Sequence, residues 1–154
     1  REAVSFMDRI IVRTERDSFY RPIITALNPA PEPTAPDAIS EAAATVAETI
    51  NAAAIVTYTT SGSTAQRAAR ERPVVPILAL TSKLATARRL ALLWGVHCVN
   101  TADVSDFGEM VGKACRVALA EELARKADKL VITAGVPFGT PGATNVLRIA
   151  WAEG

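Results

Sequence analysis

The sequence is poor in the residues that build metal sites, disulfides and most acid–base catalysts. Its 154 residues include two cysteines, Cys98 and Cys115, and one histidine, His97. Two cysteines at this separation have neither the number nor the spacing of a disulfide framework or a zinc site, so we interpret both as reduced residues in or near the core. His97 stands at the start of a predicted strand, where we expect a packed or edge histidine and not a catalytic base. The sequence therefore predicts no metal site and no catalytic residue.

Net charge and long apolar runs are also scarce. Seventeen Lys and Arg against sixteen Asp and Glu leave a net charge of +1, which gives no argument for a nucleic-acid or membrane partner. The longest apolar runs fall far short of the ~20 residues that span a bilayer, and the N-terminus lacks the basic-then-apolar pattern of a signal peptide. We expect a soluble, cytoplasmic protein in which any anion site is local.

What the chain does have is apolar content typical of one folded domain, with 49% apolar and 21% charged residues. It opens on Arg1 without an initiator Met, directly into an amphipathic helical pattern over residues 2–17, so we expect it to have been cut from a longer protein. Five of the nine prolines fall within residues 21–36, which indicates a linker. We divide the chain into a helix at 1–17, a proline-rich linker at 18–36 and a domain at 37–154.

Helical and strand-like segments alternate through that domain. Helical spacing covers residues 37–51, with Asp37 as the expected N-cap after Pro36, and residues 64–72, 83–94 and 103–126. Short apolar runs cover residues 54–58, 74–80, 96–99, 130–134 and 146–151. Such alternation predicts parallel strands with helices on both faces. Only eleven residues, 135–145, separate the last two runs, too few for a crossover helix, so we expect the fifth strand to be antiparallel at an edge. The prediction is an α/β three-layer sandwich around a five-stranded, mostly parallel sheet.

The densest polar stretch follows the first predicted strand and precedes a helix; we call residues 59–64 the first loop. In an open parallel sheet, ligands bind at the carboxyl ends of strands, where a helix N-terminus offers free N–H groups and partial positive charge to an anion. Gly62 allows close backbone approach, and hydroxyl donors come from Thr59, Thr60, Ser61, Ser63 and Thr64. We predict an anion site here; the alternative is that one serine caps the helix and the other hydroxyls are incidental.

A second loop, residues 135–145, carries three glycines and two prolines after the fourth predicted strand. It is expected at the same edge of the sheet, where the two loops close over one ligand; the alternative is a long hairpin connection with ordinary turn chemistry. Residues 63–93 add six basic residues against one acidic residue, Glu71, although most of these arginines fit a solvated helix face. The sequence contains no Walker motif, and no G-x-G-x-x-G motif follows a predicted strand. Both absences argue against a nucleoside triphosphatase or a dinucleotide-binding enzyme.

A string of ordered motifs resembles the C-terminal domain of pyruvate kinase, of bacterial type. The motifs are Thr59-Thr-Ser-Gly-Ser-Thr-Ala, Arg72-Pro73, Pro76-Ile-Leu-Ala, Ala87-Arg-Arg-Leu, Trp94-Gly-Val and the run from Val131 to Asn145. The resemblance covers residues 37–151, and Glu2-Ala-Val with Met7 and Glu15 is similar to the last helix of that enzyme's catalytic barrel.

This resemblance implies a parent enzyme that transfers a phosphoryl group from phosphoenolpyruvate to ADP in glycolysis, with Mg²⁺ and K⁺, in barrel and cap domains absent from this chain. The chain itself would be non-catalytic and would hold no cofactor. It would contribute to a tetramer, contact its own catalytic domain and bind an allosteric effector, a sugar phosphate or a nucleoside monophosphate.

The family's effector phosphate would lie on Thr59, Thr60, Ser61, Gly62, Ser63 and Thr64, and the second loop, with Gly135, Gly139, Thr140 and Gly142, would close over it. One departure is Gln66, which stands where many bacterial relatives have Arg; another is that the additional cation and aromatic of some eukaryotic members have no match. The alternative function is purely structural, with vestigial loops on a domain that only holds subunits together.

Overall fold

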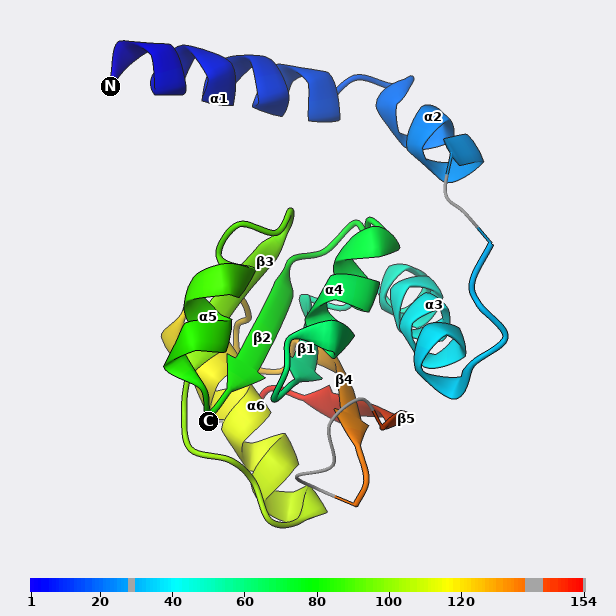
Figure 1. Cartoon of the computed structure of the whole chain (residues 1–154), viewed down its shortest axis with the longest axis vertical. Helices are drawn as coiled ribbons and strands as arrows, with labels where there is room; N and C mark the ends of the chain where they lie inside the picture. The colour runs from blue at the N-terminus through cyan, green and yellow to red at the C-terminus, as the bar shows by residue number, and fades with distance from the viewer. Residues whose placement is uncertain (28–29, 138–142, 154) are drawn as a thin grey trace. The chain divides into compact units, whose positions relative to one another are not determined.

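The computed structural model describes residues 1–27, 30–137 and 143–153. The chain divides into two compact units, Arg1–Ala30 and Pro31–Gly154. The first unit consists of helix α1 (Glu2–Glu15) and helix α2 (Tyr20–Leu27) (Figure 1). On α1, the large apolar side chains of Val4, Met7, Ile10 and Ile11 are all at least half exposed. This helix is therefore amphipathic, with its apolar face uncovered within its own unit.

Helix α2 lies inside the segment expected to be a linker, so the expectation of irregular backbone there is wrong for Tyr20–Leu27. Pro22, one of the five prolines on which the linker prediction rests, occupies the third position of α2. The first backbone bond of this helix comes from the Ile23 amide, which donates to the Phe19 carbonyl at 3.2 Å. A proline in the first turn costs little, because amides there have no partner within the helix.

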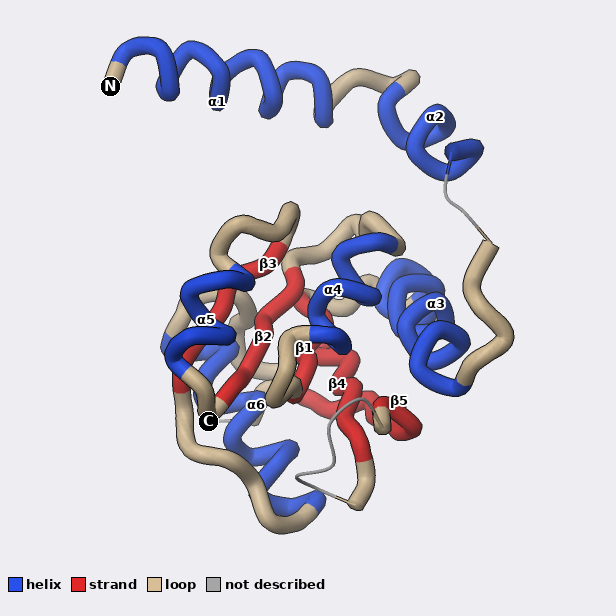
Figure 2. Tube along the Cα trace, in the orientation of Figure 1, coloured by secondary structure: helices blue, strands red, loops and turns tan. Residues whose placement is uncertain are grey.

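The second unit is a five-stranded sheet with helices on both faces, as predicted (Figure 2). In chain order its elements are α3 (Ala35–Thr49), β1 (Ala54–Tyr58), α4 (Ser63–Arg70), β2 (Ile77–Thr81), α5 (Leu84–Leu90), β3 (Val96–Asn100), α6 (Phe107–Ala120), β4 (Lys129–Gly135) and β5 (Thr144–Trp151). The strand order is β3-β2-β1-β4-β5. All pairs are parallel except β4 with β5, which confirms the antiparallel edge strand.

Alternating side chains of the central strands are buried on opposite faces of the sheet. Val56, Leu78 and Ile132 pack with the buried face of α6, whereas Ile55 and Val131 pack with α3. The helices on the second face present small side chains to the sheet, including Ala43, Ala47, Ala65 and Ala68. Each fully buried Leu, Ile or Val contributes about 1.5–3 kcal/mol, so burial of these strand side chains on both faces stabilises the sheet.

The start of α3 corrects another expectation. Asp37 was predicted as the N-cap, but Thr34 holds that position, and its hydroxyl oxygen accepts from the Asp37 amide at 3.4 Å. Pro36 lies inside the first turn, where it is tolerated for the same reason as Pro22. The Asp37 carboxylate is thereby released from the capping role and is buried, with 1% of the residue exposed. Helices α5 and α6 are also shorter than their predicted spans, and α6 ends next to Glu122, which has a φ of 57°.

Candidate anion site at the carboxyl ends of β1 and β4

The sheet topology brings the two predicted loops to one edge. β1 and β4 are parallel neighbours, with Thr57 opposite Thr133 near their carboxyl ends. The strand order also changes direction between them, because β2 and β3 follow on one side of β1 whereas β4 and β5 lie on the other. Ligands bind preferentially at such a reversal in an open α/β sheet. The first loop leaves the end of β1 and the second loop leaves the end of β4 at this point.

The first loop contains a left-handed glycine directly before α4. Gly62 has a φ of 97° and is the N-cap residue of the helix. A Cβ atom there would lie 3.2 Å from Leu90 Cδ2 and 3.4 Å from Thr86 Cγ2, so glycine is favoured by both conformation and space. Helical bonding starts with the Gln66 amide, which donates to the Gly62 carbonyl at 3.0 Å. The amides of residues 63–65 precede that first bond and form the positive end of the helix dipole.

The hydroxyl groups of the first loop divide into exposed and internal ones. The hydroxyls of Ser61 and Ser63 lie 3.1 Å apart at the exposed side. Thr59 instead uses its buried hydroxyl oxygen to accept from the Gly62 amide at 2.9 Å. The Thr60 carbonyl accepts from the Thr86 hydroxyl of α5 at 3.1 Å. Of the predicted donors, Ser61 and Ser63 therefore lie at the exposed side of the loop, where the Ser61 hydroxyl oxygen also accepts from the Ser63 amide at 3.4 Å, while the Thr59 hydroxyl is used within the loop.

Thr64 connects the two loops. Its hydroxyl lies 2.8 Å from the hydroxyl of Thr144, the first residue of β5, and both residues are buried. Thr144 did not figure among the predicted site residues. It is 80 positions away in the sequence, and only the parallel pairing of β1 with β4 brings it to this place. The first turn of α4 is thus joined to the far end of the second loop.

An arginine from α5 completes the surroundings of the first loop. The Arg89 guanidinium donates through Nη2 to the Ser61 carbonyl. The same nitrogen lies 3.5 Å from the place where a Cβ on Gly62 would stand. In the sequence, Arg89 stands out only as one member of the local basic excess. In the fold it brings a full positive charge beside the loop.

The base of the second loop is narrow and well bonded. A Cβ on Gly135 would stand 2.7 Å from the Ala143 carbonyl oxygen, so a side chain does not fit there. The Asn145 side chain donates to the Val136 carbonyl at 2.7 Å and accepts from the Val136 amide at 2.9 Å. These contacts hold the two ends of the loop together. The other residues predicted in this loop, Gly139, Thr140 and Gly142, lie outside the described residues.

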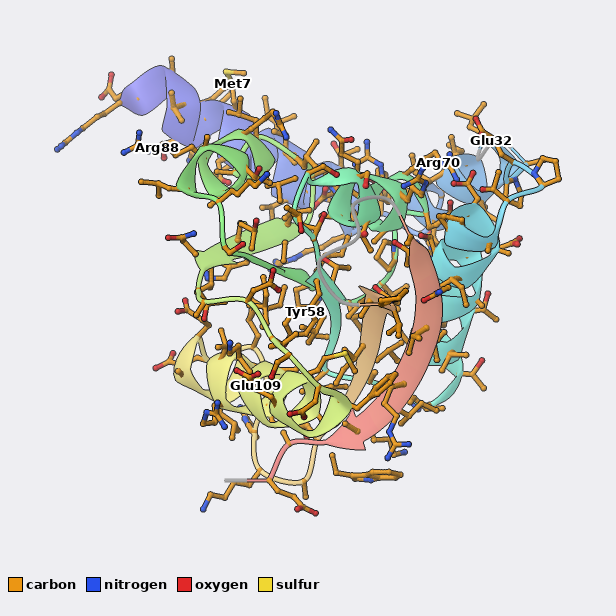
Figure 3. The ribbon with its side chains drawn as sticks, turned by 60° about the horizontal axis from the view of Figure 1, so that its bottom comes forward. Met7, Glu32, Tyr58, Arg70, Arg88 and Glu109 are labelled. Carbon is orange, nitrogen blue, oxygen red and sulfur yellow. The ribbon has the colours of Figure 1, made fainter. Side chains whose placement is uncertain are left out.

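A polar depression runs along α4 from the end of the first loop. We call it the α4 recess; it measures about 270 Å³ and is lined by Glu32, Asp37, Ser63, Gln66, Arg67 and Arg70. Glu32 and Arg70 are labelled in Figure 3. Sequence reasoning did not find this recess, because the acidic residues precede and begin α3 while the arginines come from α4, about thirty positions later.

Asp37 organises the floor of the recess. Its carboxylate accepts from Arg67 Nε at 2.9 Å, from Arg70 Nη2 at 2.7 Å and from the Glu32 amide at 2.9 Å. The hydrogen bond from Arg70 is the largest cause that holds the Asp37 pKa below its usual value, and the same bond raises the Arg70 pKa. Both groups are therefore charged at neutral pH, and the two guanidinium groups are fixed in orientation.

Possible metal ligands are scattered over the described part of the chain: no three His, Cys, Asp or Glu side chains are grouped within residues 1–27, 30–137 and 143–153. His97 lies on the edge strand β3, where Nε2 is 2.7 Å from Glu121 Oε2 in an exposed pair. In the same part of the chain, no helix is both long and apolar enough to cross a membrane.

Comparison with known proteins gives consistent matches. Residues 37–150 match the family model described as pyruvate kinase, alpha/beta domain. The chain is 47% identical to a pyruvate kinase of Methylorubrum extorquens over 150 residues, 97% of this chain and 31% of that protein. It is 41% identical to a pyruvate kinase of Geobacillus stearothermophilus over 148 residues, 96% of this chain and 25% of the relative. The fold also matches the crystal structure of a pyruvate kinase from Cryptosporidium parvum, with a TM-score of 0.77 and 26% sequence identity. The matched region covers 90% of this chain and 27% of that protein's chain.

Proposed function

This chain belongs to the pyruvate kinase family as its C-terminal alpha/beta domain, and we propose that it binds the allosteric effector of a full-length pyruvate kinase. The full-length enzyme would transfer a phosphoryl group from phosphoenolpyruvate to ADP in the cytoplasm as a step of glycolysis. The chain spans only 31% of the Methylorubrum relative. By itself it would convert no phosphoenolpyruvate, and Mg²⁺ and K⁺ would bind in the parts of the enzyme outside it.

The observation that carries this proposal is the junction at Thr64. The first turn of α4 offers amides that precede the first helical bond, and the Thr64 hydroxyl contacts Thr144 at the end of the second loop. An anion held at the start of α4 would therefore act on both loops at once. Ser61 and Ser63 would add hydroxyl donors, and Arg89 would add positive charge. A phosphate monoester matches these donors in charge and in the number of its acceptor oxygens.

The proposal is tested by calorimetric titration of sugar phosphates and AMP into the chain and into the double variant Ser61→Ala/Ser63→Ala. Each hydrogen bond to a charged group contributes about 1.5–3 kcal/mol, so loss of both hydroxyls is expected to weaken binding by roughly one to several powers of ten. Ser5→Ala, on the exposed surface of α1, is the matched control and is expected to leave affinity unchanged. Equal affinity in the double variant would place the ligand elsewhere.

A second candidate is a purely structural role in oligomer assembly. It is favoured by the way the first loop satisfies its own polar groups, because Arg89 already donates to the Ser61 carbonyl and Thr59 already accepts from the Gly62 amide. The uncovered apolar face of α1 also suits contact with another domain or subunit. In the full-length enzyme this role would contribute to a tetramer. Titrations that give no heat with any phosphate compound would favour this candidate.

A further inference from the structure

The residues that lead into α3 carry few backbone donors. The second unit begins with residues 31–34, which we call the entry segment and which read Pro-Glu-Pro-Thr. Prolines have no backbone N–H, so Glu32 holds the only amide donor of this segment ahead of Thr34, the N-cap of α3. The Glu32 amide donates to Asp37 Oδ2 at 2.9 Å. The placement of the entry segment on the second unit therefore depends on the Asp37 carboxylate.

The same carboxylate holds α4. Oδ2, which accepts from the Glu32 amide, also accepts from Arg70 Nη2 at 2.7 Å. Oδ1 accepts from Arg67 Nε at 2.9 Å. Glu32 and Arg70 lie on the same side of the molecule in Figure 3. One planar group thus connects the entry segment to two residues of α4, and a movement of the carboxylate toward one partner takes it away from the other.

Burial decides which partners Asp37 keeps. Only 1% of the residue is exposed, so its charge cannot exchange a lost partner for water without opening the structure. Two positively charged guanidinium groups stabilise a buried carboxylate more than one neutral amide does. Glu32 is exposed, so its amide can bind water instead. When α4 is displaced, we therefore expect the carboxylate to follow Arg67 and Arg70 and to give up the Glu32 amide.

Helix α4 packs through small side chains. The buried residues of this eight-residue helix are one threonine and three alanines, namely Thr64, Ala65, Ala68 and Ala69. A methyl group places a helix less firmly than a large side chain does, because it makes fewer van der Waals contacts. Polar contacts therefore contribute more to the position of α4: Thr64 with Thr144 at its start, and the two arginines with Asp37 along its side. A change at the start of so short a helix is expected to move its arginines as well.

We propose that Asp37 is a mechanical link that transmits a displacement of α4 to the entry segment. The carboxylate stays with its two guanidinium partners, and the Glu32 amide is released. Because the entry segment joins the second unit to the first, the link gives a change at the first loop, which precedes α4, a route to the connection between the units. The link is built from contacts within the second unit and does not depend on the effector-binding function proposed above.

The test is amide hydrogen exchange of the ¹⁵N-labelled full chain, followed by NMR at the Glu32 amide. Gly62→Ala disturbs the start of α4, because the added Cβ would stand 3.2 Å from the buried Leu90. It is expected to accelerate exchange at Glu32 about three- to ten-fold. Gly95→Ala is the matched control, since Gly95 also has a positive φ, of 68°, but lies outside α4 and has nothing within 4 Å of an added Cβ. It is expected to leave the exchange at Glu32 unchanged.

A second variant disturbs the same helix without adding a side chain to the loop. Thr64→Val removes the hydroxyl that contacts Thr144 at the start of α4, and it is expected to accelerate exchange at Glu32 in the same direction. This variant keeps the test available if Gly62→Ala does not fold.

The role of the carboxylate is tested by Asp37→Asn, which keeps the shape of the side chain and removes its charge. Exchange at Glu32 is expected to become about ten-fold faster, and Gly62→Ala or Thr64→Val should add no further acceleration in this background. Asp106→Asn makes the same chemical change at the N-cap of α6, where Asp106 accepts from the Glu109 amide at 2.8 Å. This control is expected to leave both the exchange at Glu32 and its response to Gly62→Ala unchanged.

The outcomes decide between a link and a purely local contact. Unchanged exchange at Glu32 in both Gly62→Ala and Thr64→Val would overturn the proposal, because Asp37 would then only stabilise the start of α3. Acceleration that persists in the Asp37→Asn background would also overturn it, since another contact would carry the displacement. An unprotected Glu32 amide in the wild-type chain would contradict the bond on which the link depends. None of these results bears on ligand binding, which the calorimetric titrations test separately.

Discussion

Substitution of Gly62 by alanine tests whether the first loop is shaped by close packing on α5. The φ of 97° places this residue in a region that costs an L-residue about 1–2 kcal/mol. The added Cβ would also stand 3.2 Å from Leu90 Cδ2, and Leu90 is fully buried, so it has little room to move. Overpacking of this kind costs about 1–3 kcal/mol. We expect Gly62→Ala to lower the free energy of unfolding by about 2–5 kcal/mol.

Gly95 provides the matched control, because it has a φ of 68° and nothing within 4 Å of an added Cβ. Gly95→Ala should therefore show the conformational cost alone, about 1–2 kcal/mol. Urea unfolding followed by tryptophan fluorescence measures both variants, since Trp94 and Trp151 are the only tryptophans and both lie in the second unit. An equal loss of unfolding free energy in the two variants, at unchanged m-value, would show that Gly62 is not closely packed against α5.

Three further predictions concern contacts described above. Thr64→Val should leave the buried Thr144 hydroxyl without its partner and lower the free energy of unfolding in urea by about 1–3 kcal/mol. The double variant Thr64→Val/Thr144→Val should recover most of that loss. A double variant less stable than the single one would contradict this. Asp37→Asn should lower the thermal midpoint at pH 7. The pKa of Asp37 in the folded protein lies below its ordinary value of 3.8, so the stabilisation by this carboxylate is complete above pH 3.8 and is lost as the pH falls through the folded pKa. The difference in thermal midpoint between the two proteins should therefore shrink below about pH 4. A difference that stays constant with pH would be contrary evidence. The exposed apolar face of α1 should make the chain self-associate in sedimentation at tens of micromolar, and Met7→Lys should weaken this association; a strict monomer would refute it.

The sheet could be predicted from sequence because its signals are local. Short apolar runs and the eleven-residue spacing before β5 identify five strands and the antiparallel edge. Helix starts are harder to predict, because a cluster of prolines indicates a linker, whereas the first turns of α2 and α3 accept Pro22 and Pro36. The boundary errors at α2 and α3 follow from that one assumption.

The candidate site was only partly predictable for a different reason. The first loop is contiguous, so its hydroxyls and Gly62 are visible in the sequence. The contacts of Thr64 with Thr144 and of Asp37 with Arg67 join residues 80 and 30 positions apart. Such pairs depend on strand order and helix placement, which residue spacing does not specify. The α4 recess, built from the second of these pairs, required the fold.

Under the proposed function, an effector phosphate binds at the start of α4 and engages both loops. The most direct measurement is the amide NMR spectrum of ¹⁵N-labelled chain during titration with glucose 6-phosphate. We expect saturable shifts at the amides of residues 63–65 and at Thr144 and Asn145, with a common dissociation constant, and their loss in Ser61→Ala/Ser63→Ala. Unchanged amides at residues 63–65, while signals elsewhere shift or none shift at all, would contradict it.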